Sequence, residues 1–118
     1  MSAKINNELG QITIDNEVIA RVAGLAATDC YGVVGMAIKG VKDGIVHLLK
    51  KDSLTKGIGI SVDEDGIRLE LHIIVEYGTN IPAIAETISS TVKYRVEEAT
   101  DLKVAGINIF VEGIRVDN

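Results

Sequence analysis

Residues Gly57–Gly78 read GIGISVDEDGIRLELHIIVEYG, and the rest of the chain is organised around them. In residues 67–77, apolar side chains alternate with mostly polar ones, which is the pattern of a strand with one buried and one largely wetted face. Residues 58–63 alternate in the same way. Asp63–Gly66 lies between the two runs, and its glycine can take the positive φ that a turn often needs. The stretch therefore predicts a long β-hairpin.

The residues before the hairpin predict a strand, a helix and a second strand. Gln11–Ile14 alternates over a short run, and Asp15 or Asn16 offers a side-chain oxygen that can cap the first turn of a helix. The helix is expected to run to about Asp29, because apolar residues recur there at helical intervals. The expected buried stripe comprises Val18, Ile19, Val22, Leu25, Ala26 and Cys30. Val33–Ile38 is a short apolar run, most simply a strand.

After the hairpin, the sequence predicts a long helix followed by a final strand. The helix is expected over Asn80–Thr100, where Pro82 is tolerated in the first turn because its missing N–H would be unpaired anyway. Its expected buried stripe comprises Ile81, Ile84, Ile88, Val92, Val96 and Ala99. Val104–Val116 alternates as a strand, but Ile114 falls out of phase, so we predict a bulge at Gly113.

Two further segments complete the expected domain organisation. Residues 39–56 hold five lysines and two aspartates, with apolar residues at a helical spacing, which predicts a short amphipathic Lys-rich helix. Residues 1–8 are polar and are expected to form a disordered N-terminal tail. Residues 9–118 are then a single domain.

The order of these elements predicts an α+β fold. We expect two layers: a mixed sheet of four to five strands, with two main helices on one face and one short Lys-rich helix. The strands at 67–77 and 104–116 are expected to lie parallel, joined by the helix between them in a crossover. The strands at 11–14 and 33–38 are expected to form a shorter version of the same unit.

The composition favours a cytoplasmic protein. The chain has 118 residues, a formal net charge of −5 and one cysteine. The acidic balance argues against bulk attraction to nucleic acid or to anionic membranes, and a single cysteine excludes an internal disulfide. No apolar run approaches the ~20 residues that span a bilayer. We therefore expect no nucleic-acid partner and no direct membrane insertion, so that any membrane role would come through a partner.

The sequence motifs predict neither a catalytic site nor a metal site. His47 and His72 lie on different predicted elements, without a Cys or a second His at metal-ligand spacing. Cys30 lies near a helix C-terminus, where the dipole disfavours a thiolate, so we expect it to be a small core residue. The acidic turn Asp63–Gly66 does not begin an EF-hand loop, because the required glycine and glutamate are missing. We expect no enzymatic activity and no cofactor.

One group of residues predicts a surface for a protein partner. If the helices cover the other face of the sheet, Arg68, His72 and Ile74 share the outward face with residues of the last strand, namely Phe110 and Glu112. Ile74 and Phe110 would then be exposed apolar residues rimmed by charges, which is typical of interfaces. Alternatively, the Lys-rich helix folds over these residues. The sequence leaves both arrangements open.

A small RNA-binding module is the second functional candidate, and an enzyme is the third. Gly32–Gly35 reads GVVG, which matches the GxxG loop of KH domains, and the basic segment 39–56 could meet phosphate. The two middle positions are valines, however, and the tetrapeptide lies between a predicted helix and a predicted strand, whereas a KH loop joins two helices. Protein binding is therefore the preferred interpretation.

Several short motifs are similar to those of a known family. The most specific is VEYGTNIPAIAETI at Val75–Ile88, and INIFVEGIRV at Ile107–Val116 agrees with it. LTKG at Leu54–Gly57 and GVVGM at Gly32–Met36 also look like family motifs. On these residues, nearly the whole chain resembles the alkaline shock protein family of Gram-positive bacteria, also called the envelope stress response family.

The resemblance implies a small non-enzymatic cytoplasmic protein linked to cell-envelope stress or lipid homeostasis, acting through protein–protein contacts and self-assembly. Some relatives are held at the membrane by a separate anchor protein or form larger assemblies. We therefore expect a protein partner, such as a membrane-anchor protein, or self-association. Ser89 and Asp101 depart from the residues common in the family, but they fall on a helix face and a helix end. The resemblance carries over no catalytic residue.

Overall fold

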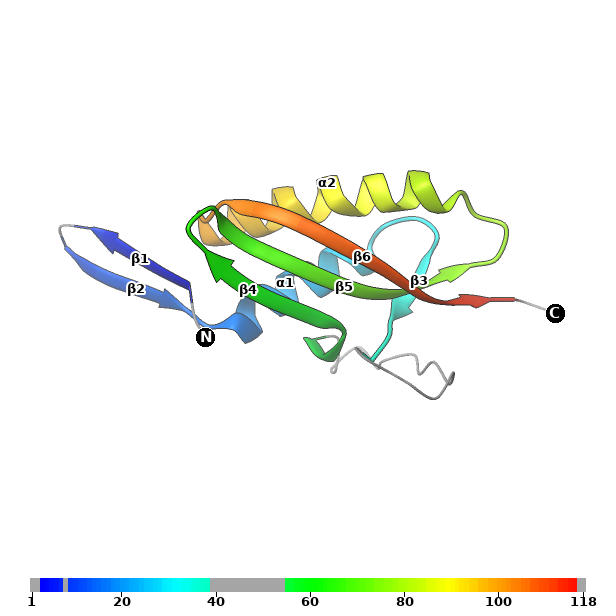
Figure 1. Ribbon diagram of the computed structural model, residues 1–118, viewed down its shortest axis with the longest axis horizontal. Helices are drawn as coiled ribbons and strands as arrows, with labels where there is room; N and C mark the ends of the chain where they lie inside the picture. Colours follow the sequence, from blue (N-terminus) through cyan, green and yellow to red (C-terminus); the bar gives the residue numbers. More distant parts are fainter. Residues whose placement is uncertain (1–2, 8, 39–54, 117–118) are drawn as a thin grey trace.

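The computed structural model describes residues 3–7, 9–38 and 55–116. A four-stranded sheet carries two helices, and a separate two-stranded sheet extends from one end of this body (Figure 1). The elements in chain order are β1 (Ala3–Asn7), β2 (Gly10–Ile14), α1 (Asn16–Thr28), β3 (Val33–Met36), β4 (Ile58–Asp63), β5 (Gly66–Glu76), α2 (Ile81–Thr100) and β6 (Val104–Arg115). The predicted α+β class with a mixed sheet is confirmed.

Strand β5 lies at the centre of the main sheet. It pairs antiparallel with β4, with Asp63 opposite Gly66 across the turn, so the predicted hairpin is confirmed. On the same edge, β3 pairs antiparallel with the C-terminal part of β5, where Met36 lies opposite Ile73. β6 runs parallel to β5 along the other edge (Figure 1). The predicted parallel unit of β5, α2 and β6 is therefore also confirmed.

Strands β3 and β4 lie end to end along one edge of β5, and Gly57 lies at their junction. A Cβ atom at Gly57 would lie 2.6 Å from the carbonyl oxygen of Ala37 and 3.1 Å from the Cβ of Met36. The Ala37 N–H donates to the carbonyl oxygen of His72 at 2.9 Å, which holds the end of β3 against β5. Because the neighbouring atoms are mostly backbone, only glycine allows the two strands to share this edge.

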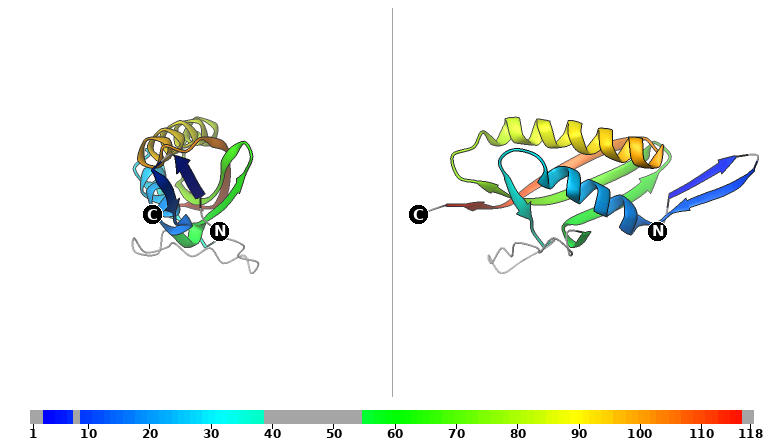
Figure 2. Two further views of the ribbon diagram at one scale, coloured as in Figure 1. Left: turned by 90° about the vertical axis from the view of Figure 1, so that its left-hand side faces the viewer. Right: turned by 180° about the vertical axis from the view of Figure 1, so that it is seen from behind.

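Helices α1 and α2 pack against each other and cover one face of the main sheet (Figure 2). The core between the layers comprises Ile67, Leu69, Leu71, Ile73 and Val75 of β5, Ile84, Ile88, Val92 and Val96 of α2, and Ile19, Ala23, Ala26 and Ala27 of α1. An ion pair at 2.6 Å between Arg95 and Asp29 joins the helices at the surface. One face of β5 therefore forms the core, and its other face points away from the helices.

Both helices begin where the sequence predicts. The Asp15 side chain caps α1 and accepts a hydrogen bond from the N–H of Glu17 at 3.3 Å. The Asn80 side chain caps α2 in the same way and accepts from the N–H of Ala83 at 3.2 Å. Each cap satisfies an amide that the first helical turn leaves without a partner.

The predicted buried stripe of α1 is partly wrong. Val18 is 52% exposed and Leu25 is 40% exposed, whereas Cys30 is buried as expected. The buried face instead comprises Ile19, Ala20, Ala23, Gly24, Ala26 and Ala27. The prediction followed the larger apolar side chains, but small side chains are what allow α1 to approach α2 and the sheet closely.

The predicted stripe of α2 is confirmed in its middle and differs at its ends. Ile81 lies at the margin, 36% exposed. At the other end, Thr100 is buried and Ala99 is exposed. The Thr100 hydroxyl donates to the carbonyl oxygen of Val96 at 2.7 Å, so this polar side chain is satisfied inside the core.

Strand β6 contains the predicted bulge. Val111 lies opposite Ile73, but the next pair is Gly113 opposite Ile74, so Glu112 is the extra residue. The shift falls at the predicted place and returns Ile114 to the side of the sheet that faces the helices.

The N-terminal part differs from the expectation in two ways. Ala3–Asn7 forms β1, which pairs antiparallel with β2, whereas a disordered tail was expected over residues 1–8. β2 does not join the main sheet, so the predicted second crossover unit is wrong. Alternation identifies a strand but not its partner, and the short polar run of β1 carries too little apolar alternation to be recognised.

The predicted Lys-rich helix falls largely outside the described residues. Of the segment 39–56, residues 39–54 lie outside the part of the chain that the structure describes. The short helix therefore stays a prediction, and so does its suggested packing over the sheet.

Candidate protein interface on the outer sheet face

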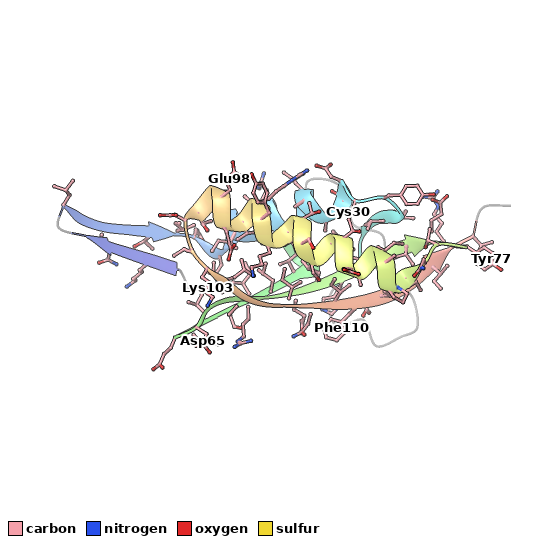
Figure 3. The ribbon with its side chains drawn as sticks, turned by 90° about the horizontal axis from the view of Figure 1, so that it is seen from above. Cys30, Asp65, Tyr77, Glu98, Lys103 and Phe110 are labelled. Atoms are coloured by element: carbon pink, nitrogen blue, oxygen red, sulfur yellow. The ribbon has the colours of Figure 1, made fainter. Side chains whose placement is uncertain are left out.

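The main sheet has an outer face, defined by the side chains that point away from α1 and α2. It comprises Gly59 and Ser61 of β4, Arg68, Glu70, His72, Ile74 and Glu76 of β5, and Gly106, Asn108, Phe110 and Glu112 of β6. All five residues that the sequence assigned to a partner surface lie on this face. Figure 3 shows Asp65 and Tyr77 toward opposite ends of the molecule, with Phe110 between them.

His72 lies at the centre of the outer sheet face, between two carboxylates. Its Nε2 lies 3.0 Å from an oxygen of Glu70, and its Nδ1 lies 3.3 Å from an oxygen of Glu112. The imidazole ring stacks on Phe110, with ring centroids 4.9 Å apart and planes at 10°. The cluster ties β5 to β6 across their parallel pairing.

Phe110 is the accessible apolar part of this cluster. Its side chain is 41% exposed although one side of the ring is stacked on His72. Glu112 stands beside it on the same strand, and Asn108 is exposed two residues earlier. An exposed aromatic side chain with a polar rim is typical of the centre of a protein interface.

Ile74 does not belong to the accessible surface, so of the two arrangements that the sequence left open, the one with an exposed Ile74 is wrong. It is only 7% exposed, although it lies on the outer sheet face as expected. Alternation assigns a side chain to a face, but it does not say what else packs on that face. The alternative, that the segment 39–56 covers it, concerns residues largely outside the described ones.

Arg68 closes one end of the face through ion pairs with the acidic turn. Its Nε lies 2.6 Å from Asp63, and its Nη2 lies 3.6 Å from Asp65. The hydrogen bond from Arg68 is the main reason that the pKa of the Asp63 carboxyl lies below its ordinary value, and the N–H of Asp65 adds to it. The same hydrogen bond to Asp63 raises the pKa of Arg68. The ion pairs of Arg68 therefore stabilise the hairpin turn.

This ion pair predicts an acid-sensitive contribution to stability. Because the pKa of Asp63 is lowered in the folded state, its contribution is present above the ordinary aspartate pKa and is lost as the pH falls through the folded value. We expect Asp63→Asn to be less stable than the wild type at neutral pH, with the difference vanishing in strong acid. Urea unfolding at neutral and strongly acidic pH measures this.

Glu64→Gln is the matched control for Asp63→Asn, because it neutralises an acidic residue of the same turn. We expect little change from it at either pH. A stability difference for Asp63→Asn that is equal at both pH values would contradict the role of the Asp63–Arg68 pair.

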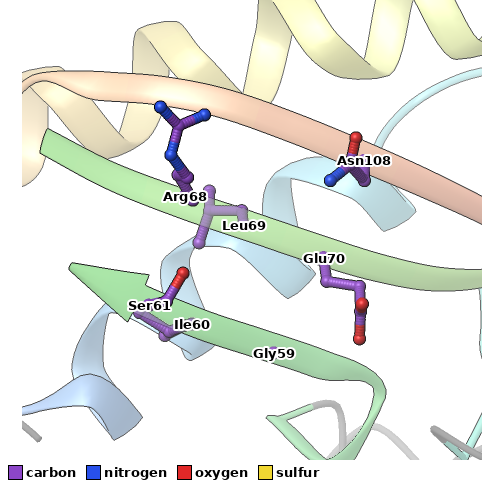
Figure 4. Close-up of a pocket in the computed structure, with 7 residues that line it drawn as sticks. All are labelled: Gly59, Ile60, Ser61, Arg68, Leu69, Glu70 and Asn108. Atoms are coloured by element: carbon purple, nitrogen blue, oxygen red, sulfur yellow. The ribbon is translucent and has the colours of Figure 1, made fainter. Parts of the chain in front are cut away.

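A hollow of about 250 Å³ lies on the same face (Figure 4). Its lining comprises Gly59, Ile60, Ser61, Arg68, Leu69, Glu70 and Asn108. These residues belong to β4, β5 and β6, and Figure 4 shows Ser61 on β4 and Asn108 on β6. The charged side chains in this lining are those of Arg68 and Glu70, which already pair with Asp63 and His72.

Two features of this face were missed from the sequence. The first is the contribution of β4, where Gly59 lies opposite Glu70 and Ser61 opposite Arg68. The second is the contact between the His72 ring and the Glu70 carboxylate. The spacing of two residues on one strand was a usable signal, because residues i and i+2 share a face.

The GVVG motif does not form a KH-type loop. Gly32 has a φ of 87° at the end of the turn after α1, and a Cβ there would lie 2.5 Å from Cδ1 of Ile84. Val33 and Gly35 are already in β3 and face Val75 and Ile74 of β5. Because the motif is packed into the sheet, it gives the RNA-binding alternative no support.

Within residues 3–7, 9–38 and 55–116, no three His, Cys, Asp or Glu side chains are grouped so that they could hold a metal ion. In the same part of the chain, neither α1 nor α2 is long and apolar enough to cross a membrane.

Comparison with known proteins finds one matching family. The profile of the alkaline shock protein family, described as having a cell envelope-related function, matches residues 4–116. The YloU protein of Bacillus subtilis strain 168 is 44% identical over 119 residues, covering 100% of this chain and 99% of YloU. The Spy1614 protein of Streptococcus pyogenes serotype M6 is 35% identical over 117 residues, covering 98% and 97% of the two chains.

A more distant relative is named for a role in the stress response. A stress response regulator gls24 homolog of Streptococcus pyogenes serotype M3 is 31% identical over 109 residues, which are 90% of this chain and 59% of the relative. No solved structure matches the chain.

Proposed function

The chain belongs to the alkaline shock protein family, which is linked to the cell envelope and includes stress-response relatives, and from this membership we propose that it is a non-enzymatic interaction protein. It acts in the cytoplasm, in envelope stress or lipid homeostasis, by binding a protein partner and by self-association. Any membrane association comes through that partner, such as a membrane-anchor protein.

The observation that carries the proposal is the aromatic centre of the outer sheet face. Phe110 is exposed, yet its ring is held in one orientation by stacking on His72. His72 is itself fixed by Glu70 and Glu112. A preorganised aromatic side chain loses little conformational entropy when a partner covers it, and such residues often dominate binding energy.

The same arrangement favours binding over catalysis. Both ring nitrogens of His72 already face carboxylates, and the side chain is only 8% exposed. A general base needs a free nitrogen within reach of a substrate proton. The cluster is therefore better suited to hold Phe110 in place than to transfer a proton.

Phe110→Glu is expected to abolish the protection that the protein gives against cell-envelope stress. A carboxylate at this position removes the aromatic anchor and adds a charge beside Glu112, where like charges repel. The measurement is the growth, under envelope stress, of a strain whose only copy of the protein carries the substitution, at matched protein level.

Tyr94→Glu is the matched control, because it exchanges an exposed aromatic residue for glutamate on α2, in the other layer. Tyr94 is 67% exposed, so the change should leave the fold and the growth unchanged. Equal growth of the Phe110 variant and the wild type would refute the role of the outer sheet face. Equal growth defects in both variants would refute it as well.

A further inference from the structure

Strand β6 forms an edge of the main sheet. It pairs with β5 along its length, and among the described residues it pairs with no other strand. The opposite edge of β5 is occupied by β3 and β4 end to end. A sheet edge exposes backbone N–H and C=O groups that can pair with another chain.

The register shows which residues of β6 direct their backbone groups away from β5. The N–H of Ile67 donates to the carbonyl oxygen of Lys103, just before β6. At the other end of the pairing, the N–H of Tyr77 donates to the carbonyl oxygen of Arg115. The odd-numbered residues of β5 therefore direct their backbone N–H and C=O groups toward β6. In parallel pairing, their hydrogen-bond partners on β6 are the residues that flank them in register, namely Gly106, Asn108 and Phe110.

The residues in between, Ile107, Ile109 and Val111, therefore direct their N–H and C=O groups outward. Before them, the N–H of Val104 is taken by the Glu97 side chain at 2.9 Å. The open edge begins after this contact and ends at the bulge after Val111, where the regular register breaks.

The open edge itself lacks the charged side chains and prolines that usually discourage edge pairing, and the two irregularities of β6 lie at its ends, after Val104 and after Val111. Residues 107–111 read INIFV and contain no lysine, no proline and no charge. Their helix-side residues are also incompletely covered: Val111 is 37% exposed, and Ile107 and Ile109 are half-buried. A second strand alongside would cover them further.

We propose that the open edge of β6 pairs antiparallel with the same edge of a second copy, with Ile109 opposite Ile109 on the two-fold axis. This register also places Ile107 opposite Val111 twice, so that all three outward residues of each copy form hydrogen-bonded pairs. Three such pairs supply about six hydrogen bonds. The inference rests on the self-association in the proposed function and gives it a site.

Charge complementarity supports a second copy as the occupant. Just beyond the open edge, this pairing brings the bulge residue Glu112 of the partner subunit toward Gly106. Arg68 lies over this glycine, because a Cβ there would be 3.0 Å from its Nη1 atom. The two-fold axis repeats this opposite-charge contact at the other end.

This contact by itself joins two copies. Each copy uses its β6 edge against the same edge, which is an isologous contact that closes on itself.

Single cysteines test the register. Ile109→Cys should form a disulfide-linked dimer under mild oxidation, because paired residues on the axis have Cα atoms about 5.5 Å apart. Ile107→Cys is the matched control, since its two copies would lie roughly 14 Å apart. A mixture of Ile107→Cys and Val111→Cys should form the mixed dimer. The native Cys30 is buried and is left in place.

Sedimentation velocity over a range of concentrations tests the edge without cross-linking. We expect a wild-type dimer that Val111→Lys weakens at least about tenfold, because a lysine ammonium disfavours a close-packed strand edge. Val18→Lys makes the same exchange on α1, where the valine is 52% exposed, and should leave the dimer unchanged. Thermal melting of each variant checks that it is folded.

A wild-type protein that stays monomeric at all concentrations overturns the proposal. So does a dimer that Val111→Lys leaves intact, or equal cross-linking of Ile107→Cys and Ile109→Cys. The role of the outer sheet face is decided separately by Phe110→Glu and Tyr94→Glu in cells. A protein that never dimerises but still loses stress protection with Phe110→Glu refutes the edge pairing alone.

Discussion

Replacing Leu71 with alanine is expected to lower the free energy of unfolding by about 2–5 kcal/mol, the range for removing a buried leucine side chain. Leu71 is fully buried in the middle of β5. It lies between Ile58 of β4 and Ile109 of β6 in the sheet register. The cavity would therefore open in the middle of the core, between the three strands and the helices. Urea unfolding followed by circular dichroism measures the loss.

Leu25→Ala is the matched control, because the same atoms are removed from a residue that the sequence also assigned to the core. Leu25 is 40% exposed on α1, so its loss should cost less than about 1 kcal/mol. Equal losses for the two variants would contradict the central position of β5.

Gly66→Ala is expected to destabilise the protein by about 2–4 kcal/mol, since it combines backbone strain with a steric clash. Gly66 ends the acidic turn with a φ of 134°, a conformation that residues with a Cβ rarely adopt. A Cβ there would lie 2.4 Å from the carbonyl oxygen of Lys103. That oxygen already accepts the N–H of Ile67 at 2.8 Å, so the clash would separate the start of β6 from β5.

Gly78→Ala separates the two causes. Gly78 also has a positive φ, of 85°, but a Cβ there would meet no atom within 4 Å. It should show the backbone strain alone, about 1 kcal/mol. If Gly66→Ala costs no more than Gly78→Ala, the close approach of Lys103 to the turn is refuted.

The parts of the fold that could be predicted are those in which local chemistry and burial agree. Residues 67–77 alternate cleanly, and they form the centre of the sheet. Asn80 and Pro82 mark the start of α2, because Asn80 caps the helix and Pro82 lies in its first turn. The bulge beside Gly113 could be predicted because a single extra residue shifts the apolar period.

The parts that could not be predicted depend on contacts between distant residues. Ile12 and Ile14 alternate like a sheet strand, yet β2 pairs with β1 rather than with the main sheet. On α1, Leu25 is larger than Ala26, but the close approach of two helices favours the smaller side chain. That β3 and β4 share one edge depends on Gly57, whose role appears only when Ala37 is placed beside it.

The candidate site divides in the same way. Alternation alone placed Arg68, His72 and Phe110 on one face, because the period of a strand assigns faces directly. It could not show that Ile74 is buried, since coverage of a face depends on other segments. The stacking of His72 on Phe110 follows from the parallel register of β5 and β6, which residue spacing within one strand does not contain.

Site-specific photo-cross-linking in growing cells tests the central claim most directly. A photoreactive residue at position 110 probes the outer sheet face, and the same residue at position 94 probes the exposed surface of α2. If the outer sheet face binds a partner, position 110 gives a discrete product that contains a second, different protein, and position 94 gives no such product. Products from position 110 that contain only this chain, or the same heterologous product from both positions, would contradict it.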